Sequence, residues 1–227
     1  MKLTRSQIPL VFGVLAAGLV WAQPDASTSS KLPVDFGDYW NAELALTYTF
    51  WDSLGDLDPA GSGGPFETEG VGFDTSIKGS IGRFGSSIVF LGFNFGMAGF
   101  DSNVFLEGFP EGSALDLTYA AATLNFRFGD PGQHYVDIDI GFGAYYASNL
   151  YIDCVAVPEC FSSETNVTKP GGFIGASWAI WRGLKLSGRV HYADFGTIGS
   201  IGPESGTLAG PMYTAQLGWE FGNWFSK

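Results

Sequence analysis

Apolar and polar side chains alternate with a period of two residues along much of this chain, and this alternation restricts its fold more than any other feature. The clearest stretch runs from Val136 to Tyr146, where apolar or aromatic side chains occupy every second position. The positions between them hold Asp137, Asp139, two glycines and Tyr145. Successive side chains of an extended strand point to opposite faces, so this stretch would have one apolar and one polar face. The period therefore predicts a β-strand, since the apolar residues of a helix recur every three or four positions.

Eight such segments follow one another, and each is about as long as the ~9–11 residues that a tilted strand needs to cross a bilayer. They are Trp40–Trp51, Glu69–Gly82, Ser87–Ala98, Leu115–Phe128, Val136–Tyr146, Gly172–Trp181, Leu184–Tyr192 and Met212–Phe221. The fourth segment is irregular, because its apolar residues change parity halfway along. The first set is Leu115, Leu117 and Tyr119, and the second set is Leu124, Phe126 and Phe128. A one-residue bulge between Ala120 and Thr123 would reconcile them, since a bulge shifts the alternation.

The connections between these segments alternate between long and short. The long ones are Asp52–Thr68, Gly99–Ala114, Ser148–Gly171 and Ala193–Pro211, and the short ones are Arg83–Ser86, Gly129–His134 and Arg182–Gly183. Bacterial membrane barrels have short periplasmic turns, long outer loops and an even number of strands. A soluble β-sandwich would explain regularly spaced strands but not this order of loops. We therefore expect an all-β fold, an eight-stranded antiparallel transmembrane up-and-down β-barrel.

The start of the chain has the three parts of a secretory signal peptide. Lys2 and Arg5 precede an apolar run from Ile8 to Val20, which is shorter than the ~20 residues of a spanning helix. We expect residues 1–22 to be a signal peptide cleaved after Ala22, residues 23–39 to be a flexible periplasmic leader, and residues 40–227 to form the barrel.

The composition supports an exported membrane barrel. Charged residues make up only 15% of the chain, against about 25% in typical soluble domains, while aromatic residues make up 16%. No apolar run after residue 22 approaches the length of a spanning helix, and the other structure that pairs every backbone group within a bilayer is a closed barrel. The net charge of −12 argues against a nucleic acid partner, because binding to phosphates requires positive charge.

The polar face of the predicted strands would line the lumen. The charged and titratable residues expected there are Glu43, Asp74, Lys78, Arg127, Asp137, Asp139, Lys185, Arg189, His191 and Glu220. An eight-stranded barrel is only wide enough for side chains to fill, and charges removed from water must be paired. We favour a salt-bridge network that plugs the lumen over a polar pathway for an ion or small solute.

Aromatic residues are expected to form two girdles at the membrane interfaces, where amphipathic rings are favoured. The set on the periplasmic side includes Trp40, Tyr135, Trp181 and Trp224, and the set on the outer side includes Tyr48, Tyr146, Tyr192 and Tyr213. Cys154 and Cys160 lie in one loop of an exported chain, which favours a local disulfide over a metal site with too few ligands. The long loops are rich in Asp and Glu, but the spacing does not supply a full Ca²⁺ ligand set. We expect no metal and no cofactor, and an acidic rim that could recruit divalent ions bridging to lipopolysaccharide phosphates.

The last strand, Gln-Leu-Gly-Trp-Glu-Phe from Gln216 to Phe221, and the segment Gly171–Gly196 resemble the small outer-membrane barrels of the OmpA membrane-domain and OmpX class. This resemblance implies a place in the bacterial outer membrane, in contact with lipid and lipopolysaccharide. It also implies recognition by the barrel-assembly machinery through a terminal aromatic residue. That residue would be Phe221 or Phe225, because residues 222–227 extend beyond the motif.

The architecture also resembles lipid A-modifying barrels, whose chemistry can be compared with the residues present. The deacylase of the PagL type has a nucleophilic Ser two residues after a base His, and here the matching position after His191 is Ala193. Alanine has no oxygen to activate, so the nucleophile is missing. Palmitoyl transfer of the PagP type would need a His at the outer rim, and the outer loops contain none. The sequence therefore favours a non-enzymatic structural or surface-interaction barrel whose loops could bind an extracellular ligand. The alternative is a narrow, OmpW-like channel for small solutes or ions.

Overall fold

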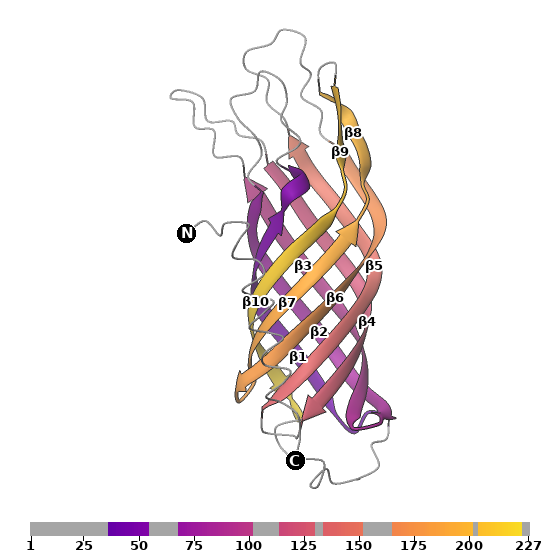
Figure 1. Ribbon diagram of the computed structural model, residues 1–227, viewed down its shortest axis with the longest axis vertical. Helices are drawn as coiled ribbons and strands as arrows, with labels where there is room; N and C mark the ends of the chain where they lie inside the picture. Colours follow the sequence, from indigo (N-terminus) through magenta and orange to yellow (C-terminus); the bar gives the residue numbers. More distant parts are fainter. Residues whose placement is uncertain are drawn as a thin grey trace.

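The computed structural model describes residues 36–54, 68–101, 114–129, 134–151, 165–201 and 204–223. Eight of its strands close into one antiparallel barrel in the order β1-β10-β7-β6-β5-β4-β3-β2 (Figure 1). They are β1 (Trp40–Trp51), β2 (Glu69–Phe84), β3 (Ser87–Asp101), β4 (Ala114–Gly129), β5 (Tyr135–Tyr151), β6 (Thr165–Trp181), β7 (Leu184–Ala193) and β10 (Pro211–Gly222). The predicted eight-stranded up-and-down barrel is thus confirmed. No helix in the described part of the chain is long and apolar enough to cross a membrane.

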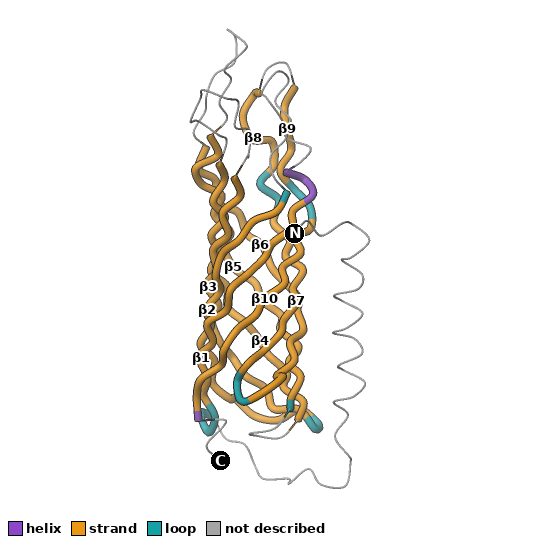
Figure 2. Tube along the Cα trace, turned by 90° about the vertical axis from the view of Figure 1, so that its left-hand side faces the viewer, coloured by secondary structure: helices purple, strands orange, loops and turns teal. Residues whose placement is uncertain are grey.

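The connection between β7 and β10 contains structure that the sequence analysis did not predict. β8 (Gly196–Ile201) and β9 (Glu204–Leu208) form a separate antiparallel hairpin that rises beyond the rim of the barrel (Figure 2). The short 3-10 helix η1 (Asp52–Leu54) follows β1 at this same end (Figure 2). We call this the loop end, and the opposite end, with the turns at Gly85 and Arg182, the turn end.

β4 alternates without interruption. Its register with β3 runs from Arg127 to Ala114 without a shift, and Leu115, Leu117 and Tyr119 all point inward and are buried. The predicted bulge between Ala120 and Thr123 is therefore wrong. The parity of the apolar residues changes because the lumen itself changes from charged to apolar along the strand.

Two apolar clusters fill the ends of the lumen. The cluster at the turn end consists of Tyr39, Ile88, Phe90, Tyr135 and Ala179. The larger cluster at the loop end includes Trp51, Leu54, Phe100, Leu115, Leu117, Tyr145, Phe173, Phe195, Leu208 and Met212. Phe195 and Leu208 lie at the base of the β8–β9 hairpin, where the Phe195 amide donates to the Leu208 carbonyl oxygen at 3.0 Å. The hairpin is therefore packed onto the interior of the barrel through its base.

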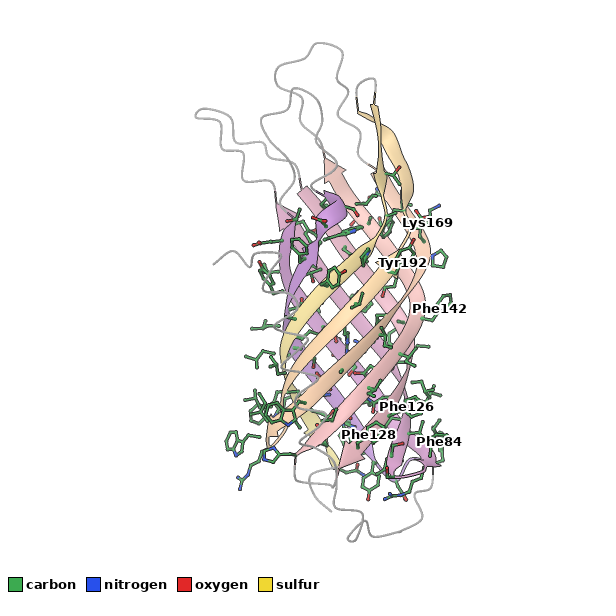
Figure 3. All side chains as sticks on the ribbon, in the orientation of Figure 1. Phe84, Phe126, Phe128, Phe142, Lys169 and Tyr192 are labelled. Atoms are coloured by element: carbon green, nitrogen blue, oxygen red, sulfur yellow. The ribbon has the colours of Figure 1, made fainter. Side chains whose placement is uncertain are left out.

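The outer surface of the barrel wall is apolar. Large hydrophobic side chains that are at least 38% exposed include Leu44, Leu46, Val71, Phe73, Ile77, Leu91, Phe93, Ile140, Phe142, Ile174, Leu217 and Phe221. Phe84, Phe126, Phe128 and Phe142 all point away from the barrel in Figure 3. Soluble monomers rarely expose so much contiguous apolar surface.

Inward-facing glycines make room for the largest side chains of the lumen. The Tyr119 ring lies across Gly96, its partner on β3, so that an added Cβ would come within 2.4 Å of the ring. The Phe173 ring lies in the same way over Gly141, and the Arg189 side chain over Gly175. Pairing small with large residues lets a narrow barrel hold bulky side chains without voids.

This packing predicts the effect of adding a single methyl group. We expect Gly96→Ala to lower the free energy of unfolding by about 1–3 kcal/mol, because the methyl group would overlap the Tyr119 ring in a filled interior. Urea unfolding of the protein in lipid vesicles, followed by tryptophan fluorescence, measures the change. Gly79→Ala is the matched control, since the nearest atom to its Cβ would be 4.0 Å away. Equal stability of the two variants would contradict the role of Gly96.

Candidate functional site

The lumen gathers the charged residues that the sequence analysis assigned to it. All ten are at most 8% exposed: Glu43, Asp74, Lys78, Arg127, Asp137, Asp139, Lys185, Arg189, His191 and Glu220. They come from all eight barrel strands except β3 and β6. Each lies at an inward position of its strand, so the alternation of the backbone alone brings them to one axis.

Arg127 is the centre of the network nearest the turn end. It faces Asp137 directly across the β4–β5 pair, and its Nε and Nη2 donate to the two carboxylate oxygens at 2.7 and 2.8 Å. Nη2 also donates to Glu220 Oε2 at 2.7 Å, across the lumen. This forked geometry is the strongest form of a charged hydrogen bond between side chains.

Two lysines complete this network. Lys185 Nζ lies 2.7 Å from Glu43 Oε2, 3.1 Å from Asp137 Oδ2 and 3.3 Å from Glu220 Oε2. Lys78 Nζ lies 3.2 Å from Asp137 Oδ2 and 3.4 Å from Glu220 Oε2. Three cations therefore meet three carboxylates, and the network is neutral. Buried charges are tolerated when each is paired and hydrogen-bonded in this way.

Tyr135 closes the network toward the turn end. Its hydroxyl donates to Glu220 Oε1 at 2.8 Å, and its ring lies 3.8 Å from the Arg127 guanidinium carbon. The assignment of Tyr135 to the periplasmic girdle is therefore wrong. Tyr135 has the same parity as Asp137 on β5, which places it inside the barrel. Its nearness to a turn does not determine which side of the wall it faces.

A second, smaller network lies farther toward the loop end. Arg189 Nη1 is 2.9 Å from Asp74 Oδ2, and Asn94 Nδ2 donates to Asp74 Oδ1 at 2.6 Å. The Tyr119 hydroxyl also donates to Asp74. Both oxygens of the Asp74 carboxylate therefore accept hydrogen bonds from side chains of other strands. Asn94 and Tyr119 were not part of the lumen network predicted from the sequence, although both lie at inward positions.

Asp139 and His191 lie apart from these ion pairs. Asp139 accepts a hydrogen bond from Asn125 Nδ2 at 2.7 Å, and His191 Nδ1 is 2.9 Å from the Tyr145 hydroxyl. The His191 ring is packed among aromatic rings, with centroids 5.0 Å from Tyr119 and 5.1 Å from Phe173. Within the described residues, His191 has aromatic neighbours and no carboxylate partner.

Among the described residues, the loop-end cluster packs closely above these networks. The Trp51 ring packs against Phe100 at 6.1 Å and Phe195 at 5.7 Å, and Trp51 is fully buried. A cavity of about 10 Å³ beside His191 is lined by Thr47, Thr49, Tyr119, Met212 and Thr214, among others. A space of that size holds about one water molecule.

The remaining predicted residues lie on the barrel exterior or outside the described part of the chain. Trp40, Tyr146, Trp181, Tyr192 and Phe221 are exposed, and Tyr48 and Tyr213 are partly exposed. Trp224, Phe225, Cys154, Cys160 and the predicted signal peptide, residues 1–22, lie outside the described residues. Among the residues that are described, no group of three or more His, Cys, Asp or Glu side chains could hold a metal ion.

No protein-family model and no curated protein matches this chain. Among solved structures, it is similar to the attachment invasion locus protein Ail of Yersinia pestis in complex with the heparin analogue sucrose octasulfate. The two are 14% identical with a TM-score of 0.39, over 83% of this chain and 100% of Ail. The N-terminal β-barrel domain of Pseudomonas aeruginosa OprF is 12% identical, with a TM-score of 0.41, over 80% of this chain and 97% of that domain.

Neisserial surface protein A is 13% identical to this chain, with a TM-score of 0.37, over 84% of this chain and 98% of that protein. These structures are small barrels of the class that the sequence resembles.

The central position of Arg127 makes it the most informative residue to remove. We expect Arg127→Met to destabilise the barrel by about 3–5 kcal/mol, because Asp137 and Glu220 would stay buried without their closest cation. Urea unfolding in vesicles measures the loss. Arg83→Met is the matched control, because Arg83 is exposed at the end of β2, beside the turn to β3. A loss below 1 kcal/mol for Arg127→Met would show that the network does not support the fold.

Proposed function

We propose that this chain is a non-conducting barrel of the bacterial outer membrane that holds its loop end at the cell surface as a platform for interactions. The observation that carries the proposal is the inverted distribution of polarity, with an apolar exterior and a charged interior. A soluble protein buries its apolar side chains and keeps its charges in water. The opposite arrangement fits a barrel surrounded by lipid.

The ends of the wall support this placement in a bilayer. Trp40, Trp181 and Trp219 are exposed near the turn end, and Tyr146 and Tyr192 are exposed toward the loop end. Bands of amphipathic aromatic residues at both edges of an apolar wall are typical of membrane barrels. Together with the predicted signal peptide and the short turns, they favour the outer membrane, with the turn end in the periplasm.

The filling of the lumen supports a barrel that does not conduct. The neutral network around Arg127 lies between two layers of packed apolar side chains, and Trp51, Tyr135, Tyr145, Phe90 and Phe100 are fully buried. An ion entering this lumen would have to displace paired charges and packed aromatic rings. The interior is therefore better suited to fixing the barrel than to transport.

The geometry around His191 gives no support to an enzyme. His191 and Ala193 are both buried inside the barrel, and the partner of His191 Nδ1 is the Tyr145 hydroxyl. The acyl chains of a lipid substrate would lie outside the wall. A task carried by the surface of the loop end fits these observations better than hydrolysis or acyl transfer.

The proposal predicts that the protein does not conduct ions across a lipid bilayer. Purified protein inserted into planar lipid bilayers should show no stable open steps, because paired charges and packed aromatic side chains fill the described part of its lumen. Insertion is verified on the same preparation by a change of gel mobility on boiling. Discrete, reproducible conductance steps would instead support the alternative, a narrow channel for ions or small solutes.

The proposal also predicts which end of the barrel faces outward. An epitope tag inserted after Gly202, between β8 and β9, should be reached by antibody on intact cells. The same tag inserted after Gly85, in the turn between β2 and β3, should be reached only after the cells are permeabilised. The reverse pattern would contradict the proposed orientation.

A further inference from the structure

The exterior of the turn end carries a patch with an unusual backbone geometry. It consists of Trp181, Arg182 and Gly183 at the β6–β7 turn and Trp219 on the neighbouring strand β10, and we call it the turn patch. Trp181 is 58% exposed, Trp219 is 37% exposed and Arg182 is exposed. The patch therefore lies on the outside of the barrel, away from the charge network of the lumen.

Arg182 adopts an unfavourable backbone conformation. Its φ of 37° makes it the one non-glycine residue with a positive φ among those described, and Gly183 follows with a φ of 95°. A two-residue hairpin with two positive φ angles strongly favours Asn-Gly, because Asn tolerates the left-handed region better than Arg. An arginine at this position carries a conformational cost, and such outliers are concentrated at functional sites.

Trp181 reaches the exterior through a break in the strand. Ser177 and Ala179 point inward, so uninterrupted alternation would place Trp181 inside as well. The β6–β7 register shifts between Ala179 and Trp181, and this shift turns the indole outward. Bulges commonly redirect a side chain in this way.

The groups of the turn patch are held close to one another. The indoles of Trp181 and Trp219 meet edge to face at 6.1 Å, and the Arg182 guanidinium carbon lies 5.9 Å from the Trp181 ring. Trp219 Nε1 would be only 3.3 Å from a Cβ on Gly183, so this donor lies against the turn. The Gly183 carbonyl oxygen accepts from the Glu220 amide at 2.8 Å, which fixes the turn to β10. The polar side-chain groups of the patch are an arginine and two indoles, and all of them are donors.

We propose that the turn patch binds the phosphate of a phospholipid headgroup in the leaflet at the turn end. Arg182 would contact the phosphate oxygens, and the two indoles would lie at headgroup depth, where such rings are favoured. This inference rests on the proposed placement in a membrane, and it adds a specific lipid contact to it. Among the described charged side chains that are exposed, Arg83 and Arg182 lie at the turn end and Asp52 and Asp194 at the loop end, which agrees with an anionic ligand at the turn end.

The test compares two arginine variants of the whole protein. Native mass spectrometry in a neutral detergent measures binding of phosphatidylglycerol and of diacylglycerol with the same acyl chains. We expect the wild-type protein to retain phosphatidylglycerol and not diacylglycerol. Arg182→Asn should weaken phosphatidylglycerol binding at least about tenfold, since hydrogen bonds to a charged group are worth more than one decade of affinity. Arg83→Asn, which removes an exposed arginine from another turn, should leave it unchanged.

The same variant separates lipid binding from folding. In neutral detergent without phospholipid, Arg182→Asn should be at least as stable as the wild type, because Asn relieves the turn. Equal loss of binding in both variants, or no loss in Arg182→Asn, would overturn the inference while leaving the membrane barrel intact. Displacement of the lipid by millimolar inorganic phosphate would assign the patch to a free anion and overturn the lipid site. Failure of the wild-type protein to insert into vesicles would overturn the proposed function and this inference together.

Discussion

Everything in this molecule depends on closing eight strands around a space that side chains alone can fill. Such a narrow barrel leaves little room for solvent to screen a charge, so each inward cation needs a carboxylate within contact distance. The structure meets this requirement with forked and shared contacts around Arg127, and with a second set around Asp74. The same lack of space explains why glycines lie under the largest rings, since a side chain on Gly96 would overlap the Tyr119 ring.

The lumen is layered along its axis, and the layers differ in polarity. Aromatic and aliphatic side chains close the turn end, paired charges occupy the region above them, and a larger apolar cluster closes the loop end. The apolar layers keep water away from the ion pairs, which strengthens each electrostatic contact. The loop-end cluster also includes the base of the β8–β9 hairpin, so this hairpin is anchored in the packed interior. The exterior, by contrast, carries at the turn end the one described non-glycine residue with a positive φ, Arg182.

The alternation of residues was sufficient to predict eight strands, their order and the inward position of the ten titratable residues. Alternation failed at β4, where the apolar inward face at the loop end was interpreted as a bulge. Hydrophobicity alone does not tell which side of the wall a residue faces. The prediction also failed at Tyr135, where nearness to a turn outweighed parity. The β8–β9 hairpin was missed because its segment is rich in Gly, Ser and Thr and lacks a clear apolar period. Which carboxylate meets which cation could not be predicted, since contacts across the lumen depend on the stagger of the closed barrel.

The ion pairs of the turn-end network have a consequence for the order of assembly. Glu43 belongs to the first strand of the barrel and Glu220 to the last, while Lys78, Arg127 and Lys185 belong to strands between them. In a sheet that has not yet joined β1 to β10, Glu43 and Glu220 lie on opposite edges, so Lys185 cannot contact both of them. Pairing β1 with β10 brings both carboxylates within contact distance of the same lysine. Ion pairs therefore stabilise the closed barrel, and a barrel that lacks either terminal strand would lose these contacts.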